Sequence, residues 1–260
     1  MGCDRKEGSR LKKIEIENLT FRYKSRDKGQ TAPVLKEAAF FAEDGESVGI
    51  IGANGAGKST LLKILVGLLP GYEGSVQVCG MDVVKENLSA IRRKAGYVFQ
   101  DSDSQLFMNT VYEDVAFAPR NYGMSEEKVK ERTLEALRQT GIEELKDRHI
   151  YRLSGGQKKL AAIASVLSMG AEILLMDEPS AALDPGNRRK LIHILNELPA
   201  VRLIASHDLD FIYDTCGRTV LLSEGEIVRA GKTEEILKDE ELLASHGLEL
   251  PLSFRFMKGV

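Results

Sequence analysis

Short apolar segments separated by longer amphipathic ones dominate the pattern of the chain. Apolar and polar residues alternate from residue 14 toward residue 23, as in a strand with one exposed face. Mostly apolar runs at 47–51, 173–176 and 203–205 are short enough to be buried strands. Because helical segments lie between these runs, the pattern predicts a largely parallel sheet with helices on both faces.

Helical spacing and charge mark the segments between the strands. The helices predicted in this way are 58–69, 126–140, 154–169, 187–198 and about 234–244. Ser154 suits the N-cap of its helix, because its hydroxyl can accept a hydrogen bond from the first turn. Residues 219–222 and 227–228 flank a Glu-Gly pair and predict a hairpin, and a loose tail is expected at the end of the chain.

Composition and charge exclude some classes of protein. Hydrophobic residues make up 43% of the chain, charged residues make up 29%, and the net charge is -3. This weakly acidic balance gives no electrostatic reason to expect a nucleic-acid partner. The cysteines Cys3, Cys79 and Cys216 match no zinc-binding spacing and are expected to be plain thiols.

Two segments bear on the relation of the chain to a membrane. The first six residues are polar and lack the apolar stretch of a secretion signal. Residues 160–176 approach the length of a membrane span, but Gly170 and Glu172 interrupt them. We therefore expect a buried helix followed by a short strand, no membrane-crossing segment, and any membrane role to come through a partner.

A phosphate-binding loop is the clearest chemical motif. Residues 52–60 read GANGAGKST, with two glycines, a lysine and a serine at the positions that the pattern requires. Glycines let backbone N–H groups approach phosphate oxygens, and the helix that follows points its positive end at the anion. Lys58 is expected to reach the terminal phosphates of ATP, and the Ser59 hydroxyl to ligate Mg²⁺. The predicted nucleotide contacts of the loop are Gly52, Asn54, Gly55, Gly57, Lys58, Ser59 and Thr60.

A second motif is the pair of acids, Asp177 and Glu178, that ends the apolar run at 173–176. Asp177 can hold the Mg²⁺ shell, and Glu178 can orient or deprotonate an attacking water. Such a pair alone often marks a strand that leaves the core. The phosphate loop upstream makes the catalytic interpretation the stronger one.

The segment Leu153-Ser154-Gly155-Gly156-Gln157 resembles the signature sequence of ABC ATPases. Further motifs of that family occur in the family's order. Tyr23 resembles the aromatic residue that stacks on adenine, and Gln100 resembles the Q-loop glutamine that touches Mg²⁺ and the nucleophilic water. Residues 180–184 resemble the D-loop, and His207 resembles the switch histidine near the γ-phosphate. The family often has Arg at the position of Leu160, so no salt bridge is assigned there.

The resemblance implies a phosphate-loop NTPase core with an antiparallel β portion at its N-terminus and an inserted, mostly helical subdomain. The expected ATPase domain spans residues 11–232. Its core covers about 11–100 and 154–232, and the helical subdomain covers about 101–153. Residues 233–260 are expected to form a C-terminal helical tail.

The resemblance also implies an assembly. In this family the signature of one subunit completes the nucleotide site of another, so Ser154, Gly156 and Gln157 are expected to bind ATP held by a second ABC ATPase subunit. That subunit can be an identical or a different chain. Hydrolysis would then use Glu178, His207 and Gln100, the last of which also touches Mg²⁺ together with Ser59 and Asp177.

A subfamily and a membrane partner are implied in the same way. Residues 105–107, 110–121 and 246–251 resemble ATPases of energy-coupling-factor transporters, a group that includes cobalt, nickel and vitamin uptake systems. The segment 100–121 resembles the region where the family contacts its transmembrane coupling subunit, at the cytoplasmic face of the cell membrane. Its residues expected to be available to that subunit are Leu106, Phe107, Val111, Glu113 and Asp114.

Other functions of ABC ATPases remain open at this point. A soluble ATPase of chromosome maintenance would carry long coiled coils, but only about 95 residues separate Lys58 from Ser154 and they show no sustained heptads. A translation-factor type normally has two cassettes, and one is present. A regulatory module without turnover would not need Glu178 and His207. The identity of the transported solute is not encoded in these motifs.

Overall fold

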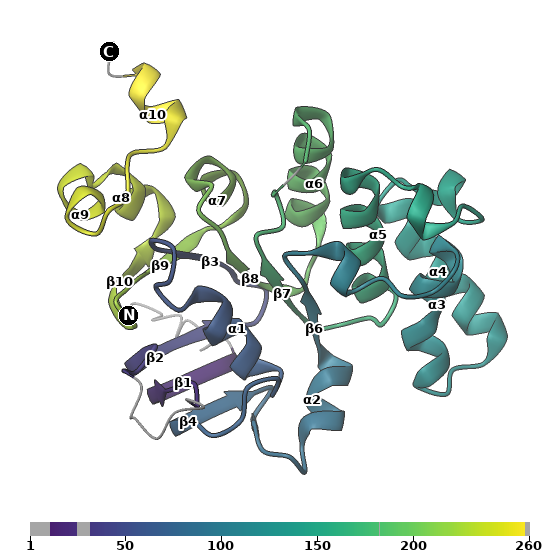
Figure 1. Ribbon diagram of the computed structural model, residues 1–260, viewed down its shortest axis with the longest axis horizontal. Coiled ribbons are helices and arrows are strands. Elements are labelled where there is room, and N and C mark those ends of the chain that lie inside the picture. The colour runs from purple at the N-terminus through teal and green to yellow at the C-terminus, as the bar shows by residue number, and fades with distance from the viewer. Residues whose placement is uncertain (1–10, 25–31, 182, 258–260) are drawn as a thin grey trace, which may run out of the picture.

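Two β-sheets and the helices that pack against them form the fold of the computed structural model (Figure 1). The structure describes residues 11–24, 32–181 and 183–257, with side chains as far as residue 254. Cys79 is half-buried, Cys216 is buried, and both are free thiols, whereas Cys3 lies outside the described residues.

In the described part of the chain, the larger sheet has six strands in the order β10-β9-β3-β8-β7-β6. They are β3 (Ser47–Ile51), β6 (Ala95–Val98), β7 (Ile173–Asp177), β8 (Val201–Ala205), β9 (Arg218–Ser223) and β10 (Glu226–Lys232). All neighbouring pairs are parallel except β9 and β10, which form the predicted hairpin. Every residue of β3, β6, β7 and β8 is buried, as expected for parallel strands covered on both faces. The predicted largely parallel sheet is confirmed.

The smaller sheet is antiparallel and has the order β2-β1-β4-β5. Its strands are β1 (Lys12–Phe21), β2 (Leu35–Glu43), β4 (Glu73–Val78) and β5 (Met81–Asp82). In β1, Ile14 and Ile16 face the core while their polar neighbours do not, so the alternation predicted from the sequence is present. This sheet is the expected N-terminal antiparallel portion.

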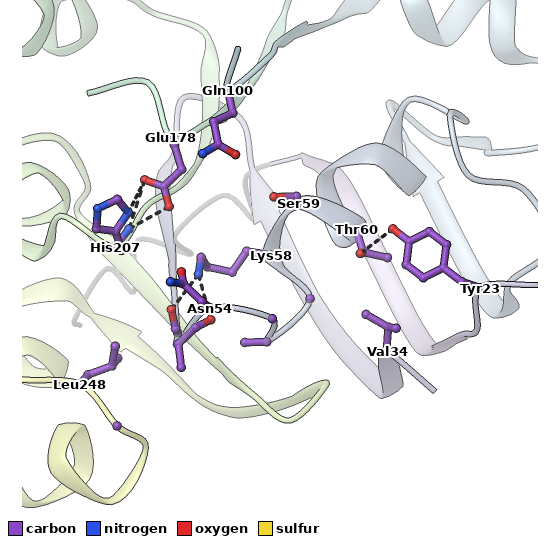
Figure 2. A pocket seen from close by; sticks show the side chains of 16 residues that line it. Tyr23, Val34, Asn54, Lys58, Ser59, Thr60, Gln100, Glu178, His207 and Leu248 are labelled. Atoms are coloured by element: carbon purple, nitrogen blue, oxygen red, sulfur yellow. Dashed lines mark hydrogen bonds and ion pairs between the residues drawn. The ribbon is translucent and has the colours of Figure 1, made fainter. Parts of the chain in front are cut away.

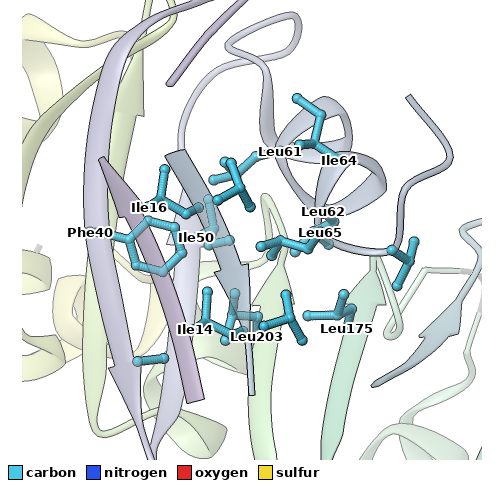
Figure 3. Packing of buried hydrophobic residues seen from close by; sticks show 14 of the residues in the cluster. Ile14, Ile16, Phe40, Ile50, Leu61, Leu62, Ile64, Leu65, Leu175 and Leu203 are labelled. Atoms are coloured by element: carbon cyan, nitrogen blue, oxygen red, sulfur yellow. The ribbon is translucent and has the colours of Figure 1, made fainter. Parts of the chain in front are cut away.

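The helix α1 (Lys58–Leu65) lies between the two sheets and contacts β4, β7 and β8. Figure 3 shows apolar side chains from both sheets meeting this helix, among them Ile14, Ile16 and Phe40 from the smaller sheet, Leu61, Leu62, Ile64 and Leu65 from α1, and Ile50, Leu175 and Leu203 from the larger sheet. The helix ends earlier than predicted, because Gly67 takes a left-handed conformation and the N–H groups of Gly67 and Leu68 bond back to Ile64 and Lys63.

The chain between β6 and β7 forms a helical group at one end of the molecule (Figure 1). After α2 (Leu88–Lys94) and β6, it contains η1 (Ser102–Ser104), α3 (Val111–Asn121), α4 (Glu126–Gln139), η2 (Glu143–Leu145), η3 (Ile150–Arg152) and α5 (Gly155–Leu167). Ser154 caps α5 as predicted, with its hydroxyl accepting from Gln157 N and the Gln157 side chain accepting from Ser154 N. The expected helical insertion is confirmed.

One expectation about this helical group is wrong. Leu106 and Val111 are buried, with 6% and 0% of their surface exposed, because both pack into the apolar interior of the group. Asp114 is also buried and accepts hydrogen bonds from the backbone N–H groups of Phe107 and Met108. Phe107 is 64% exposed, as the sequence analysis expected.

The remaining helices are α6 (Pro185–Glu197), α7 (Leu209–Thr215), α8 (Thr233–Lys238), α9 (Glu240–Ser245) and α10 (Leu252–Met257). Of these, α6, α7 and α8 lie on the face of the larger sheet opposite α1, α9 packs on α8, and α10 lies beyond α7 and α8 (Figure 1). The single helix predicted at 234–244 is wrong: Asp239 leaves helical geometry at the end of α8 and caps α9 by accepting from Leu242 N. The tail after α9 is not loose, because Asp210 accepts hydrogen bonds from the N–H groups of Leu252 and Ser253.

No helix in the described part of the chain has both the length and the apolar character needed to cross a membrane.

Candidate active site

Four neighbouring strands of the larger sheet, β3, β8, β7 and β6, run parallel and therefore end at the same edge. The phosphate loop follows β3, Ser206 and His207 follow β8, Asp177 and Glu178 lie at the end of β7, and Gln100 follows β6. Ligands of open α/β sheets bind beyond the carboxyl ends of the strands. The sheet topology thus gathers residues that are far apart in the sequence.

A cavity of about 660 Å³ opens at this edge (Figure 2). Its volume is in the usual range for small-molecule sites. The predicted site residues that line it are Tyr23, Gly52, Asn54, Gly55, Gly57, Lys58, Ser59, Thr60, Gln100, Glu178 and His207. Asp177 does not line the cavity, but it is buried and accepts a hydrogen bond from Ser59, which does. Most of the sequence-predicted site therefore surrounds one cavity.

The backbone of the phosphate loop requires glycine at two points. Gly57, which precedes the first turn of α1, has φ of 109°, and a Cβ there would come within 3.0 Å of Val34 O. A Cβ on Gly52 would come within 2.1 Å of Leu222 O. With these glycines the loop lies close to the sheet and α1 directs its N-terminal N–H groups to the cavity, an arrangement that suits phosphate.

Lys58 is buried in the loop and donates hydrogen bonds to the carbonyls of Gly52 and Ala53, at 2.7 and 3.1 Å from Nζ. Burial lowers the pKa of Lys58, and the carboxylates of Glu178 and Asp177 act in the opposite direction. A cation held at the floor of a glycine loop fits a polyphosphate ligand, which can replace these carbonyl contacts with stronger charged ones.

Asp177 and Ser59 form the part of the site that suits Mg²⁺. The Ser59 hydroxyl donates to Asp177 Oδ1 at 2.9 Å, so the two oxygen groups are adjacent. The described residues contain no cluster of three or more His, Cys, Asp or Glu that could hold a metal by itself. The adjacent carboxylate and hydroxyl fit Mg²⁺, which usually takes one or two carboxylates together with substrate phosphates and waters.

Glu178 is held firmly at the end of β7. It is 7% exposed, and its φ of 47° lies in the left-handed region. Its carboxylate accepts from Ser206 Oγ at 2.9 Å and from His207 N at 3.1 Å, and His207 Nδ1 lies 2.9 Å from Oε2 (Figure 2). A strained, oriented carboxylate at the edge of a cavity is suited to contact a reacting water.

Tyr23 lies just past the end of β1, at the far side of the cavity from His207 (Figure 2). Its hydroxyl is 3.0 Å from Thr60 Oγ1, and 44% of the residue is exposed. The contact with Thr60 holds the ring beside the phosphate loop, where a base attached to the phosphates would lie. The position agrees with a stacking role, which stays a prediction.

Tyr23→Ala is expected to weaken ATP binding about tenfold, because stacking of a base on an aromatic ring contributes about 1–3 kcal/mol. Binding of inorganic triphosphate should not change, since it has no base. Both affinities can be measured by calorimetry, with Tyr23→Phe as the control that keeps the ring. An equal loss for both ligands would contradict stacking.

The signature residues do not join this cavity. Ser154 is exposed at the start of α5, Gly156 and Gln157 follow it, and none of the three lines the cavity. The D-loop assignment is partly outside the described residues, because residue 182 is not described, but Asp184 caps α6 by accepting from Gly186 N and Asn187 N. Within one chain, the signature is therefore separate from the phosphate loop.

Four residues at or near the site were missed by sequence reasoning. Ser206 binds Glu178, and Leu248 from the C-terminal tail lines the cavity. Lys159 is buried and donates to the carbonyls of Phe99 and Gln100 at 3.0 and 2.6 Å. The fourth is Tyr97 on β6. The Lys159 side chain could have been suspected, because a lysine within an apolar helical run has to find a partner.

Tyr97 donates to Asp177 Oδ2 at 3.1 Å. Burial, followed by the nearby Asp177 carboxylate, raises the pKa of Tyr97, so its hydroxyl remains a donor at neutral pH. No motif in the sequence marks this tyrosine.

Comparisons with known proteins agree on one family. The family model described as "ABC transporter" matches residues 35–181, which is more than half of the chain. The energy-coupling factor transporter ATP-binding protein EcfA2 of Caldanaerobacter subterraneus is 39% identical over 245 residues, which cover 92% of this chain and 85% of EcfA2.

Solved structures agree as well. The structure of cbiO1 from Clostridium perfringens, described as part of the ABC transporter complex cbiONQ, is 34% identical with a TM-score of 0.79 and covers 95% of this chain and 99% of that one. A dimeric ATP-binding cassette, MJ0796 bound to ADP and Pi, is 30% identical with a TM-score of 0.77 and covers 85% and 98% of the two chains.

Proposed function

The chain belongs to the ABC transporter family and is an ATPase, and we propose that it dimerises head to tail around two ATP molecules and drives uptake of a small solute through a membrane partner. The observation that carries this proposal is the separation of Ser154 from the phosphate loop, although both have the chemistry to bind phosphate. A second subunit placed head to tail would bring its Ser154 to this cavity. The dimeric form of the related MJ0796 cassette supports the arrangement.

In the proposed site each residue has a task set by its position. The N–H groups of residues 55–59 and Lys58 bind the phosphates, Tyr23 binds the base, and Ser59 and Asp177 would hold Mg²⁺, which supplies positive charge at the phosphate oxygens. Glu178 orients the attacking water and accepts its proton, and His207 lies beside Glu178 and faces the same cavity. Gln100, at the end of β6, links this chemistry to the helical subdomain proposed for residues 101–153.

A groove that Phe99, the residue before Gln100, helps to line supports a membrane partner. It has a volume of about 250 Å³ and lies between β6, the turn after α1, the middle of α3 and the end of α5. The exposed apolar residues at its surface are Leu68, Phe107 and Phe117, and the two phenylalanine rings meet edge to face at 4.8 Å. Exposed aromatic rings around a hollow are typical of a helix-binding groove. We assign this groove to a helix of the transmembrane coupling subunit, which would hold the ATPase peripherally at the cytoplasmic face of the membrane.

The relatives support one class of transporter. The similarity to EcfA2 and to cbiO1 supports an energy-coupling-factor transporter, and with it a metal ion or a vitamin as the solute. A soluble ABC ATPase with a role other than transport is the alternative. The groove favours the transporter, because a soluble enzyme has no evident use for two adjacent exposed phenylalanines.

The double variant Phe107→Asp, Phe117→Asp is expected to abolish binding to the coupling subunit, because two charges would enter an apolar contact. Folding and ATP binding should survive, since both residues are exposed. The measurement is retention on membranes that contain the partner, together with ATP-driven transport. Val84→Asp, Val228→Asp is the matched control, because these residues are 45% and 43% exposed and lie outside the groove.

Two outcomes would contradict the transporter assignment. In one, the Phe107→Asp, Phe117→Asp protein still co-purifies with the membrane subunit as well as the control does. In the other, the unaltered chain never does so, and a soluble ATPase becomes the better interpretation.

A further inference from the structure

The hydrogen bond from Tyr97 to Asp177 is not explained by any motif of the site. Tyr97 lies on β6 and pairs in register with Leu175 of the neighbouring strand β7, which ends at Asp177. Its hydroxyl donates to Asp177 Oδ2 at 3.1 Å, and Asp177 is only 3% exposed. The Tyr97 hydroxyl on one strand therefore contacts the carboxylate at the end of the neighbouring strand, which is also the carboxylate bonded to Ser59.

Both oxygens of this carboxylate accept a hydrogen bond. Ser59 at the start of α1 donates to Oδ1 at 2.9 Å, and Tyr97 donates to Oδ2. The two donors come from different elements, so together they fix the rotation of the carboxylate plane. Without the second donor, a carboxylate with one bond can turn about its side-chain torsion, which is broad for Asp.

The position of the Tyr97 hydroxyl is itself fixed by packing. The ring is 9% exposed and meets Phe99 edge to face, with 4.8 Å between ring centroids. Since the chain leaves β6 after Val98 and reaches Gln100 two residues later, the same short segment carries the tyrosine and the Q-loop glutamine. A rigid ring on a buried strand is a good support for a group that must not move.

A purely structural interpretation can be compared within the same chain. Tyr72 also has a hydroxyl bond, which is partly buried and which it donates to the carbonyl of Val83 at 2.8 Å. That acceptor is a backbone group far from the cavity, so the bond only satisfies the hydroxyl. The acceptor of Tyr97 is a charged side chain bonded to Ser59 of the cavity, where a change of orientation would affect ligand binding.

We propose that Tyr97 is a positioning residue for Mg²⁺ binding: its hydroxyl holds the Asp177 carboxylate in the orientation in which Asp177 and Ser59 together receive the ion. This inference rests on the proposed function, in which Mg²⁺ enters with ATP. The hydroxyl itself does not touch the ion. It acts through the orientation of Asp177.

The test is Tyr97→Phe, which removes one oxygen and keeps the ring. The affinity for a non-hydrolysable ATP analogue is measured by calorimetry, once with Mg²⁺ and once with EDTA. We expect the gain in affinity that Mg²⁺ gives to fall about tenfold, because loss of a residue that orients a metal ligand typically costs 10–100-fold in metal affinity. The affinity in EDTA should not change. Titration with Mn²⁺ followed by electron paramagnetic resonance gives the same comparison without hydrolysis.

Two controls separate the possible causes. Tyr72→Phe removes a comparable hydroxyl bond and should leave the Mg²⁺ gain intact. Asp177→Asn should remove most of that gain. If it does not, the assignment of Asp177 is wrong and the proposed site fails, whatever the result for Tyr97.

Two results for Tyr97→Phe would overturn the inference while leaving the proposed function in place. One is an unchanged Mg²⁺ gain beside a reduced gain in Asp177→Asn. The other is an equal loss of affinity in Mg²⁺ and in EDTA, which would mean that the hydroxyl supports the shape of the cavity and not the metal ligand. Thermal unfolding of both tyrosine variants checks that each protein is folded at the temperature of the measurement.

Discussion

Glu178→Gln is expected to slow ATP hydrolysis by at least about 10²-fold while ATP binding persists, since a positioned general base typically contributes 10²–10⁴-fold. The carboxylate lies at the end of β7 and faces the cavity beside His207. An amide has the same shape and can still accept from His207 N. It cannot take a proton from water, so the chemical step is the one that suffers.

The Glu178→Gln protein is expected to fold, because the groups around residue 178 can also bond to an amide. Ser206 now donates to Oε2, and its hydroxyl can rotate to accept from the new amide instead. Because ATP would still bind and would not be consumed, a dimer with trapped ATP should accumulate. Size-exclusion chromatography with and without ATP detects that dimer, and single-turnover kinetics measures hydrolysis.

Asp114→Asn is the matched control for this prediction. Asp114 is also a buried carboxylate held by two donors, Phe107 N and Met108 N, but it lies in the helical group away from the nucleotide cavity. Its change to an amide should leave ATP turnover of the isolated protein nearly unaltered. Near-normal turnover of Glu178→Gln would remove Glu178 from the role of base.

The parts of the fold that could be predicted are those in which local chemistry and tertiary packing agree. The run at 47–51 is mostly apolar, and the Gly and Lys spacing that follows it has few structural solutions, so β3, its loop and the start of α1 were all expected. Ser154 was expected as a cap because its hydroxyl can accept a hydrogen bond from the first turn, and the structure adds the reciprocal bond from Ser154 N to the Gln157 side chain. Most of the site residues predicted from such sequence signals line one cavity in the structure.

The parts that could not be predicted depend on contacts across the chain. Val111 was expected to be available to a membrane partner. In the structure it is covered by α4 and α5, which come later in the sequence. Asp239 divides a helical pattern because its side chain caps the second half and pairs with Arg229. Tyr97 is an apolar-looking strand residue until the neighbouring strand places Asp177 beside its hydroxyl.

Lys58→Ala is expected to abolish nucleotide binding, because it removes the buried cation that the proposed site places at the terminal phosphates. Ser154→Arg should leave ATP binding to the isolated subunit intact, since Ser154 does not line the cavity of its own chain. It should still block hydrolysis, because a bulky cation would replace the hydroxyl offered to the partner's ATP. The loss of the cap on α5 costs about 0.5–2 kcal/mol, which a stable domain tolerates.

The two inactive variants together test the head-to-tail arrangement. A mixed dimer joins the intact phosphate loop of the Ser154→Arg subunit to the intact signature of the Lys58→Ala subunit, and both lesions fall in the other site. An equal mixture should therefore recover roughly one quarter of the wild-type rate if subunits pair at random and the sites act independently. The control mixes Ser154→Arg with the double variant Lys58→Ala, Ser154→Arg, which contains no complete site in any pairing. If the first mixture is no more active than this control, or if a purified monomer hydrolyses ATP at the full rate, the signature does not act between subunits.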